Sequence, residues 1–136
     1  MKLLLILSPL LFVSTLSAKD VILDTTTKLL WQDAPINKDA QVTYKEARAY
    51  CKYLKIGKYH NFRLPTLYEL QSIVDYNNYD PAILKGFKYV TSTSYWTTTP
   101  FADDNSEVWT INFDKGSRST KAKYYDRHFR CVQKLK

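Results

Sequence analysis

The chain has 136 residues, which is enough for one domain and hardly for two. With 45% hydrophobic and 15% aromatic residues, and with only 3 Gly and 5 Pro, the composition excludes a collagenous, disordered or coiled-coil protein. The 20 basic and 13 acidic side chains give a formal net charge of +7, so anionic molecules are the first partners to consider.

Residues 1–18 have the pattern of a secretory signal peptide. A positively charged start precedes an almost wholly apolar run over residues 3–13, and the segment ends at the small residue Ala18. We expect cleavage before Lys19; the alternative is an N-terminal helix that stays in the fold. No cysteine follows the apolar run to carry a lipid, and no later segment has the roughly 18 apolar residues of a membrane span. The expected product is a periplasmic or secreted protein with one domain over residues 19–136.

The mature chain is predicted to open with a hairpin followed by two helices. Residues 21–24 and 28–31 flank a run of three threonines and predict the hairpin. Thr43-Tyr44-Lys45-Glu46 has the pattern of a capping box, so a helix begins there, and Gly57 would end it. Thr66-Leu67-Tyr68-Glu69 is a second capping box that opens another helix. The apolar face of that helix consists of Leu67, Leu70, Ile73 and Val74.

In the second half of the chain, apolar residues recur with the period of two that is typical of strands. The expected strands cover residues 95–99, 107–113, 119–124 and 129–135, with a turn at 114–117. Phe129, Cys131 and Leu135 would face inward in the last strand. Trp31 and Trp109 are interpreted as core residues, because tryptophan is highly buried on average. The expected fold class is therefore α+β, with two helices packed on antiparallel strands.

The two cysteines are interpreted in the light of the predicted export. Exported proteins form and keep disulfides, and two cysteines leave a single intramolecular pairing, Cys51 with Cys131. Two buried free thiols or a metal pair are the alternatives. His60 and His128 stand at no recognised metal-ligand spacing from either cysteine. We expect one disulfide and no metal or other cofactor.

The excess of positive charge is confined to the end of the chain. Residues 1–114 carry 12 basic and 12 acidic side chains, whereas residues 115–136 carry 8 basic side chains and one acidic side chain. If Cys131 faces inward, the alternation of a strand turns Arg130, Lys134 and Lys136 to the other face. The first helix adds a stripe, because Lys45, Arg48, Lys52 and Lys55 follow each other at steps of three, four and three.

These cations are the candidate ligand-binding residues, and a Cys51–Cys131 bond would join their two segments. The full set is Lys115, Arg118, Lys121, Lys123, Arg127, Arg130, Lys134, Arg48, Lys52 and Lys55. Sulfated or carboxylated polysaccharide, lipopolysaccharide or anionic lipid heads, and nucleic acid would all suit a basic surface. Export disfavours nucleic acid among them. The alternative interpretation is a solvated surface whose charge maintains solubility.

Enzyme signatures are absent from the sequence. It contains no glycine-rich phosphate loop, no nucleophile elbow and no His-Glu-x-x-His motif. The acidic stretch over residues 102–107 has oxygen ligands of the kind that calcium takes. It lacks the Glu-Pro-Asn or Gln-Pro-Asp triplet of calcium-dependent lectins, and its spacing is not that of a calcium-binding helix-loop-helix. We interpret it as a solvated turn and expect no calcium dependence.

Five segments of the chain carry a family resemblance. They are residues 24–31, the helix with Ala47 and Cys51, the run Phe62-Arg63-Leu64-Pro65-Thr66 followed by Glu69-Leu70, the strand Tyr95-Trp96-Thr97-Thr98-Thr99, and the closing Arg130-Cys131-Val132. Together they resemble the bacterial domain family named after the C-terminal domain of the Legionella collagen-like adhesin. The resemblance covers nearly all of the mature chain. The chain departs from the family where Phe62 replaces the usual tryptophan, and it has no collagen-like stalk.

The resemblance implies a fold and a setting for the protein. Such domains look like relatives of the C-type lectins, in which a cysteine on the first helix bonds a cysteine in the final strand. The name-giving adhesin is associated with sulfated polysaccharides. The lectin-like superfamily is also similar to the formylglycine-generating sulfatase activators, which use a reactive cysteine pair close in sequence. Because Cys51 and Cys131 are far apart in the chain, we interpret them as a structural disulfide and expect no enzyme.

We therefore expect an exported, non-catalytic module that binds an anionic polysaccharide, or another surface polyanion, through a basic C-terminal surface. The alternative is a small periplasmic partner of an envelope protein complex, with a basic surface that only keeps the protein soluble.

Overall fold

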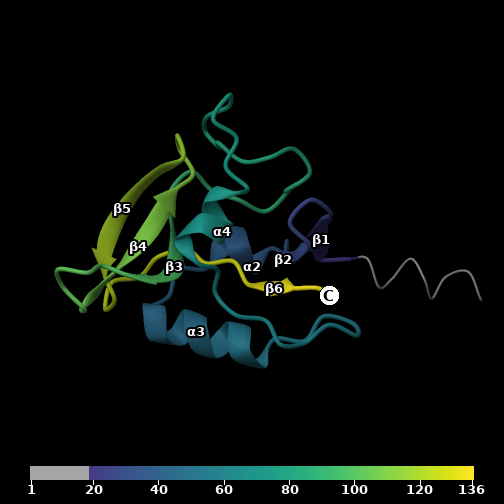
Figure 1. Ribbon diagram of the computed structural model, residues 1–136, viewed down its shortest axis with the longest axis horizontal. Helices are drawn as coiled ribbons and strands as arrows, with labels where there is room; N and C mark the ends of the chain where they lie inside the picture. The colour runs from purple at the N-terminus through teal and green to yellow at the C-terminus, as the bar shows by residue number, and fades with distance from the viewer. Residues whose placement is uncertain (1–18) are drawn as a thin grey trace, which may run out of the picture.

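The computed structural model describes residues 19–136, and the predicted signal peptide lies outside the described residues. Within this range the chain forms two three-stranded antiparallel sheets and three short helices, which confirms the α+β class (Figure 1). The elements in chain order are β1 (Val21–Asp24), β2 (Leu29–Gln32), α2 (Ile36–Asp39), α3 (Tyr44–Tyr53), α4 (Leu67–Gln71), β3 (Ser94–Pro100), β4 (Glu107–Asn112), β5 (Ser117–Ala122) and β6 (Val132–Lys134).

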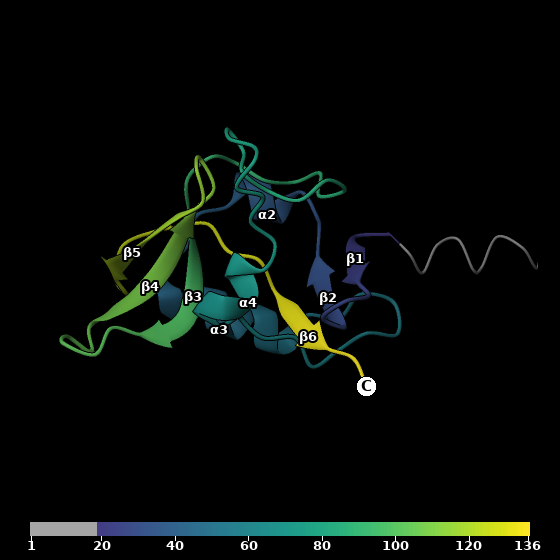
Figure 2. The same cartoon turned by 45° about the horizontal axis from the view of Figure 1, so that its top comes forward.

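The first sheet joins the two ends of the described chain. β1 and β2 form the expected hairpin, and β6 pairs with the other edge of β2, so the strand order is β1-β2-β6. Leu29 lies opposite Lys134 and Trp31 lies opposite Val132. Figure 2 shows these strands side by side, apart from the second sheet. The last strand is shorter than expected, because regular pairing begins only at Val132.

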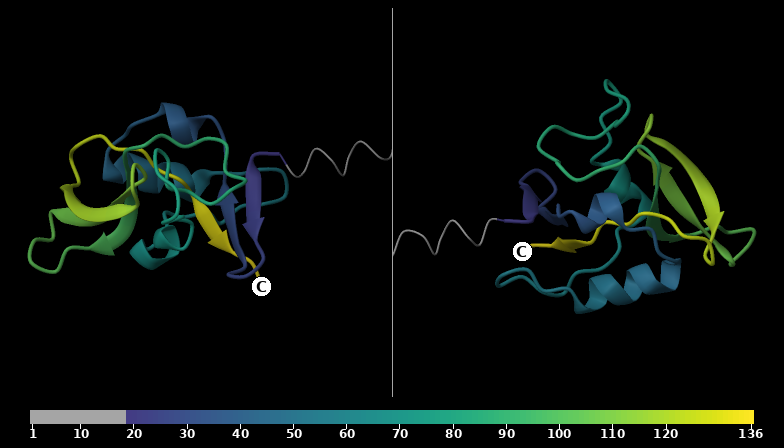
Figure 3. Two further views of the ribbon diagram at one scale, coloured as in Figure 1. Left: turned by 90° about the horizontal axis from the view of Figure 1, so that it is seen from above. Right: turned by 180° about the vertical axis from the view of Figure 1, so that it is seen from behind.

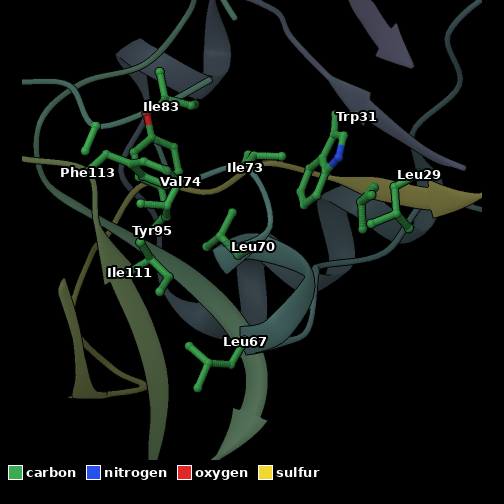
Figure 4. Packing of buried hydrophobic residues seen from close by; sticks show 12 residues of the cluster. Leu29, Trp31, Leu67, Leu70, Ile73, Val74, Ile83, Tyr95, Ile111 and Phe113 are labelled. Atoms are coloured by element: carbon green, nitrogen blue, oxygen red, sulfur yellow. The ribbon is translucent and has the colours of Figure 1, made fainter. Parts of the chain in front are cut away.

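The second sheet is a meander of β3, β4 and β5, and buried side chains pack against both of its faces. Alternation sends Tyr95 and Ile111 to the side of α4, and Trp96 and Val108 to the side of α3. The α4 side also receives Leu67, Leu70, Ile73 and Phe113, as Figure 4 shows. The α3 side contains Ala47, Cys51, Phe62, Leu64 and Phe129. Trp31 is buried as expected, whereas Trp109 is only partly buried.

Both helices that begin at capping boxes do so for the local reason that their sequences predict. The Thr43 hydroxyl accepts a hydrogen bond from the backbone N–H of Glu46, and the Glu46 carboxylate accepts one from the N–H of Thr43. Thr66 and Glu69 repeat this exchange at α4. The expected end of α3 at Gly57 is wrong.

The helix ends at Tyr53 because the backbone of Leu54 is already extended, with ψ of 134°. Gly57, with φ of 58°, instead forms the turn that lets Ile56 pair with Tyr59.

The expected disulfide between Cys51 and Cys131 is present. It joins the last turn of α3 to the segment just before β6, with a Cα–Cα distance of 5.4 Å. The right-hand view of Figure 3 shows α3 running beside this final segment. Both cysteines are fully buried. No helix within residues 19–136 is long and apolar enough to cross a membrane.

Candidate functional site

A groove of about 710 Å³ runs along the exposed side of α3. We call it the α3 groove. The residues that line it are Tyr44, Lys45, Arg48, Ala49, Lys52, Tyr53, Phe62, Arg63, Leu64, Thr98 and Lys123. They come from α3, the family motif before α4, the end of β3 and the segment after β5. The groove therefore combines an apolar floor, aromatic side chains and a basic rim.

The periodicity of α3 places the cations in this groove. Ala47 and Cys51 are fully buried, so the face of α3 that carries them is turned toward the core. Lys45, Arg48 and Lys52 project from the neighbouring exposed face, at the spacing of one helical stripe. Lys55 was expected to continue this stripe. It lies beyond the end of the helix and lines a separate hollow with Tyr50, Leu54 and Gly57.

Lys123 reaches the same groove from the other end of the chain. After β5 the backbone crosses the start of α3, where the N–H of Tyr44 donates to the carbonyl of Lys123 at 3.1 Å. Further along, Val42 and Arg127 exchange two backbone hydrogen bonds of 2.9 Å. This crossing places the Lys123 ammonium 5.4 Å from the centre of the Tyr44 ring. The Arg48 guanidinium lies 5.7 Å from the same centre.

The Tyr44 ring is thus a shared contact for two cations, each held by a cation–π interaction. Tyr44 is fixed in turn by an edge-on contact with the buried Trp96, at 5.8 Å between ring centres. The indole N–H of Trp96 donates to the carbonyl of Val42, just before the helix. Two positive charges are therefore held on one rigid aromatic support at the N-terminal end of the groove.

Four cations of the groove have no acidic partner among residues 19–136. The ion pairs within residues 19–136 are Arg63 with Glu69 and Arg130 with Asp33. Lys45, Arg48, Lys52 and Lys123 therefore have no described carboxylate within 4.0 Å. Arg63 differs, because Glu69 binds it through two oxygens at 2.6 and 2.8 Å. Burial opposes the ionisation of Glu69, but hydrogen bonds from Arg63 and Thr66 outweigh it and lower the pKa of Glu69.

The remaining residues of the predicted basic surface do not form one face. Arg118 lies opposite Ile111 in the sheet and Lys121 lies opposite Val108, so their side chains leave β5 on opposite sides. Lys115 is exposed in the turn before β5. Lys134 belongs to the first sheet, and Figure 1 shows α4 between that sheet and the sheet of β3, β4 and β5. The structure brings Lys123 to the groove and pairs the backbone of Arg127 with Val42, just before α3, whereas Lys115, Arg118, Lys121 and Lys134 do not line the groove.

The expected outward orientation of Arg130 is wrong. Its side chain is fully buried, and the guanidinium donates to the carbonyl of Gln32 at 2.6 Å and to the Asp33 carboxylate at 3.0 Å. It also donates to the carbonyl of Tyr89 at 2.5 Å and lies over the Phe87 ring. Residues 128–131 are all buried, because this segment passes between the two sheets and does not follow the alternation of an exposed strand.

Arg130 is therefore a structural residue rather than a ligand-binding one. Its partner Asp33 also accepts hydrogen bonds from the backbone N–H groups of Lys88 and Tyr89. Together the two charges fasten the long connection before β3 to the first sheet. Nearby, the hydroxyl of Tyr95 donates to the carbonyl of Asn37, and burial raises the pKa of Tyr95.

The sequence contains a signal for one half of the groove only. Tyr44 and Arg48 are four residues apart on a capped helix, which is the spacing that brings side chains into contact. Nothing in the local sequence places Lys123 beside them, because that contact depends on the path of the chain after β5. The acidic stretch over residues 102–107 is exposed for most of its length, and Asp104 is bonded to the backbone and hydroxyl of Ser106.

Comparison with protein families gives a match over almost the whole described chain. The family model described as the Lcl C-terminal domain matches residues 20–133. Comparison with curated proteins gives no match. The match includes both sheets, α3 and the disulfide, and it agrees with the resemblance seen in the motifs of the sequence. With its elements and its match extending together from β1 to β6, the chain belongs to the Lcl C-terminal domain family, an adhesin-related family.

Proposed function

We propose that this protein is an exported, non-catalytic module that binds an anionic polysaccharide in the α3 groove. The observation that carries the proposal is the convergence of Arg48 and Lys123 on the Tyr44 ring, with Lys45 and Lys52 along the same groove. Clustered cations repel one another, so a fold that gathers them without carboxylates loses stability that a bound polyanion would restore. Of the expected C-terminal basic surface, the proposal keeps only Lys123, which lines the groove beside α3.

The chemistry of the groove suits sulfate or carboxylate groups on a sugar chain. Arg48 offers a planar fork of donors to such a group, and the three lysines supply less directional charge. The floor contributes Phe62 and Leu64, while Tyr44 and Tyr53 stand along α3. This mixture of apolar and basic groups suits a polymer that has both apolar ring faces and anionic substituents.

Two further observations support the proposed setting. The chain belongs to an adhesin-related domain family, and its two cysteines form a disulfide, which is typical of exported proteins. We also propose that the fold is C-type-lectin-like, because a disulfide joins α3 to the segment that leads into the final strand.

The test compares two double charge reversals of equal size. Arg48→Glu with Lys123→Glu reverses the two cations that contact the Tyr44 ring and leaves Lys45 and Lys52 in place. Arg118→Glu with Lys115→Glu makes the same change of charge on the β4–β5 hairpin. Binding to dextran sulfate would be measured by calorimetry at several salt concentrations. We expect the groove variant to lose affinity by at least about tenfold, or 1.4 kcal/mol, and the hairpin variant to lose clearly less.

The logarithm of the affinity of the unmodified protein should fall linearly with the logarithm of the salt concentration, since each neutralised anion releases counterions. The groove variant should have a shallower slope. Equal losses of affinity in the two variants would contradict the proposal that the α3 groove is the binding site. Absence of binding to dextran sulfate, together with a salt-insensitive complex with a protein, would contradict the function itself and favour an envelope partner.

A further inference from the structure

Tyr53, at the C-terminal end of α3, has an aromatic ring that the fold does not use. Its side chain is 74% exposed. The neighbouring Tyr50 is 37% exposed and packs edge-on against the buried Phe129, with ring centres 5.1 Å apart. Within the described chain Tyr53 makes no aromatic contact of this kind. The Lys52 ammonium lies 5.6 Å from the centre of the Tyr53 ring.

The position of Tyr53 makes it a ridge between two hollows. On one side it lines the α3 groove. On the other side it lines a shallow hollow with Glu46, Ala49 and Leu54. Ala49 lies one helical turn before Tyr53 and has a small side chain. The phenol ring of Tyr53 therefore protrudes from the surface of α3.

Each end of the groove therefore pairs an aromatic ring with a cation. At the N-terminal end Arg48 and Lys123 flank Tyr44, and at the C-terminal end Lys52 flanks Tyr53. The two tyrosines are nine residues apart on one helix, which corresponds to about 14 Å along its axis. Tyr44 is packed against the core through Trp96, whereas the ring of Tyr53 remains open to a ligand.

We infer that Tyr53 is a stacking platform that makes the α3 groove select polymers of anionic sugar rings over other polyanions. A pyranose ring has a flat face of C–H groups that fits an aromatic ring, and a sulfate or carboxylate on the same ring would meet Lys52. A polyphosphate chain offers the charge but no such face, so only the cations would hold it. The inference rests on the proposed function and adds the feature of the ligand that determines specificity.

The experiment measures the affinity of four proteins for two polymers. The polymers are dextran sulfate, whose anions are carried on pyranose rings, and inorganic polyphosphate, which has no ring. The proteins are the unmodified chain, Tyr53→Ala, Tyr53→Phe and Tyr68→Ala. Tyr68 is the matched control, because it is 77% exposed on α4 and lies outside the groove.

We expect Tyr53→Ala to weaken binding to dextran sulfate by about tenfold, which is the scale of one stacked ring. Its affinity for polyphosphate should be unchanged. Tyr53→Phe and Tyr68→Ala should bind both polymers like the unmodified protein. Because Tyr53 is exposed at the end of a helix, all four proteins should have the same circular dichroism spectrum.

Three results would overturn the inference, and they separate it from the proposed function. If Tyr53→Ala binds dextran sulfate normally while Arg48→Glu with Lys123→Glu does not, the platform is wrong and the basic groove stands. If Tyr53→Ala lowers the affinity for both polymers equally, the ring does not select polymers of sugar rings. If the unmodified protein binds neither polymer, both proposals are wrong.

Discussion

At Arg130 a positive charge is held inside the protein by partners from two distant parts of the chain. Gln32 is the last residue of β2 and Asp33 follows it, whereas Tyr89 belongs to the connection that leads to β3. Burial lowers the pKa of Arg130, and the Tyr95 and Asp33 groups beside it act in the opposite direction. A buried charge is tolerated only with such partners, because its transfer from water is otherwise very costly.

Replacing Arg130 should therefore destabilise the protein more than replacing an exposed arginine. We expect Arg130→Met to lower the free energy of unfolding by about 3 kcal/mol, since it leaves the Asp33 carboxylate buried without its cation. Arg118→Met is the matched control, with an expected change within about 0.5 kcal/mol. Urea denaturation would measure both. A loss below about 1 kcal/mol for Arg130→Met would show that backbone N–H donors satisfy Asp33 without it.

The segment over residues 128–131 is the element that makes the two sheets one molecule. Backbone hydrogen bonds join His128 to Ser94 and Trp96 of the second sheet, and Cys131 to Gln32 of the first sheet. His128 is itself buried against the Tyr95 ring, at 5.4 Å between ring centres. Its Nδ1 atom is buried without a hydrogen-bond partner among the described residues.

Protonation of His128 should consequently destabilise the fold. Burial lowers the pKa of His128 below the ordinary value of 6.5, and contacts with Asn37 and Asp39 oppose this only in part. Below about pH 6.5 the unfolded chain binds a proton at this position that the folded chain does not yet bind, so the free energy of unfolding falls. The decrease should level off once the pH is below the pKa of the folded state.

Thermal unfolding across this pH range would measure the effect. His128→Gln removes the titrating group, so its stability should change less between about pH 7.5 and pH 5.5 than that of the unmodified protein. An identical pH dependence in the two proteins would show that other groups are responsible.

At the scale of the whole molecule, the disulfide is a covalent link between two distant segments of the chain. It closes a loop with a sequence separation of 80 residues, and it ties α3 to the segment that joins the sheets. In the chain-entropy model a loop of this length contributes about 4 kcal/mol, which is a large part of the 5–15 kcal/mol of a typical domain.

Reduction should thus lower the stability of the protein. We expect the free energy of unfolding in urea to fall by about 4 kcal/mol in the presence of a reductant. The double variant Cys51→Ala with Cys131→Ala should be similarly destabilised and should not respond to the reductant. If reduction leaves the urea midpoint unchanged, the packing of the two cores holds the fold without the covalent link.

The sequence by itself determined the features that depend on neighbouring residues. Both capping boxes, the hairpin of β1 and β2, and the strands β4 and β5 joined by a turn follow from spacings of a few residues, and the structure contains all of them. The pairing of Cys51 with Cys131 was determined by a count of two. Each of these features is specified by interactions within one element or by the absence of an alternative partner.

Only the tertiary structure decided which charges share a surface. The rule of strand alternation predicted an exposed Arg130, but the rule applies only where a strand is regular, and regular pairing starts at Val132. The predicted C-terminal surface was divided because β5 and β6 belong to different sheets. Lys123 joined Arg48 because the chain crosses the start of α3 after β5. Such contacts depend on the packing of segments that are distant in sequence, and local periodicity contains no information about them.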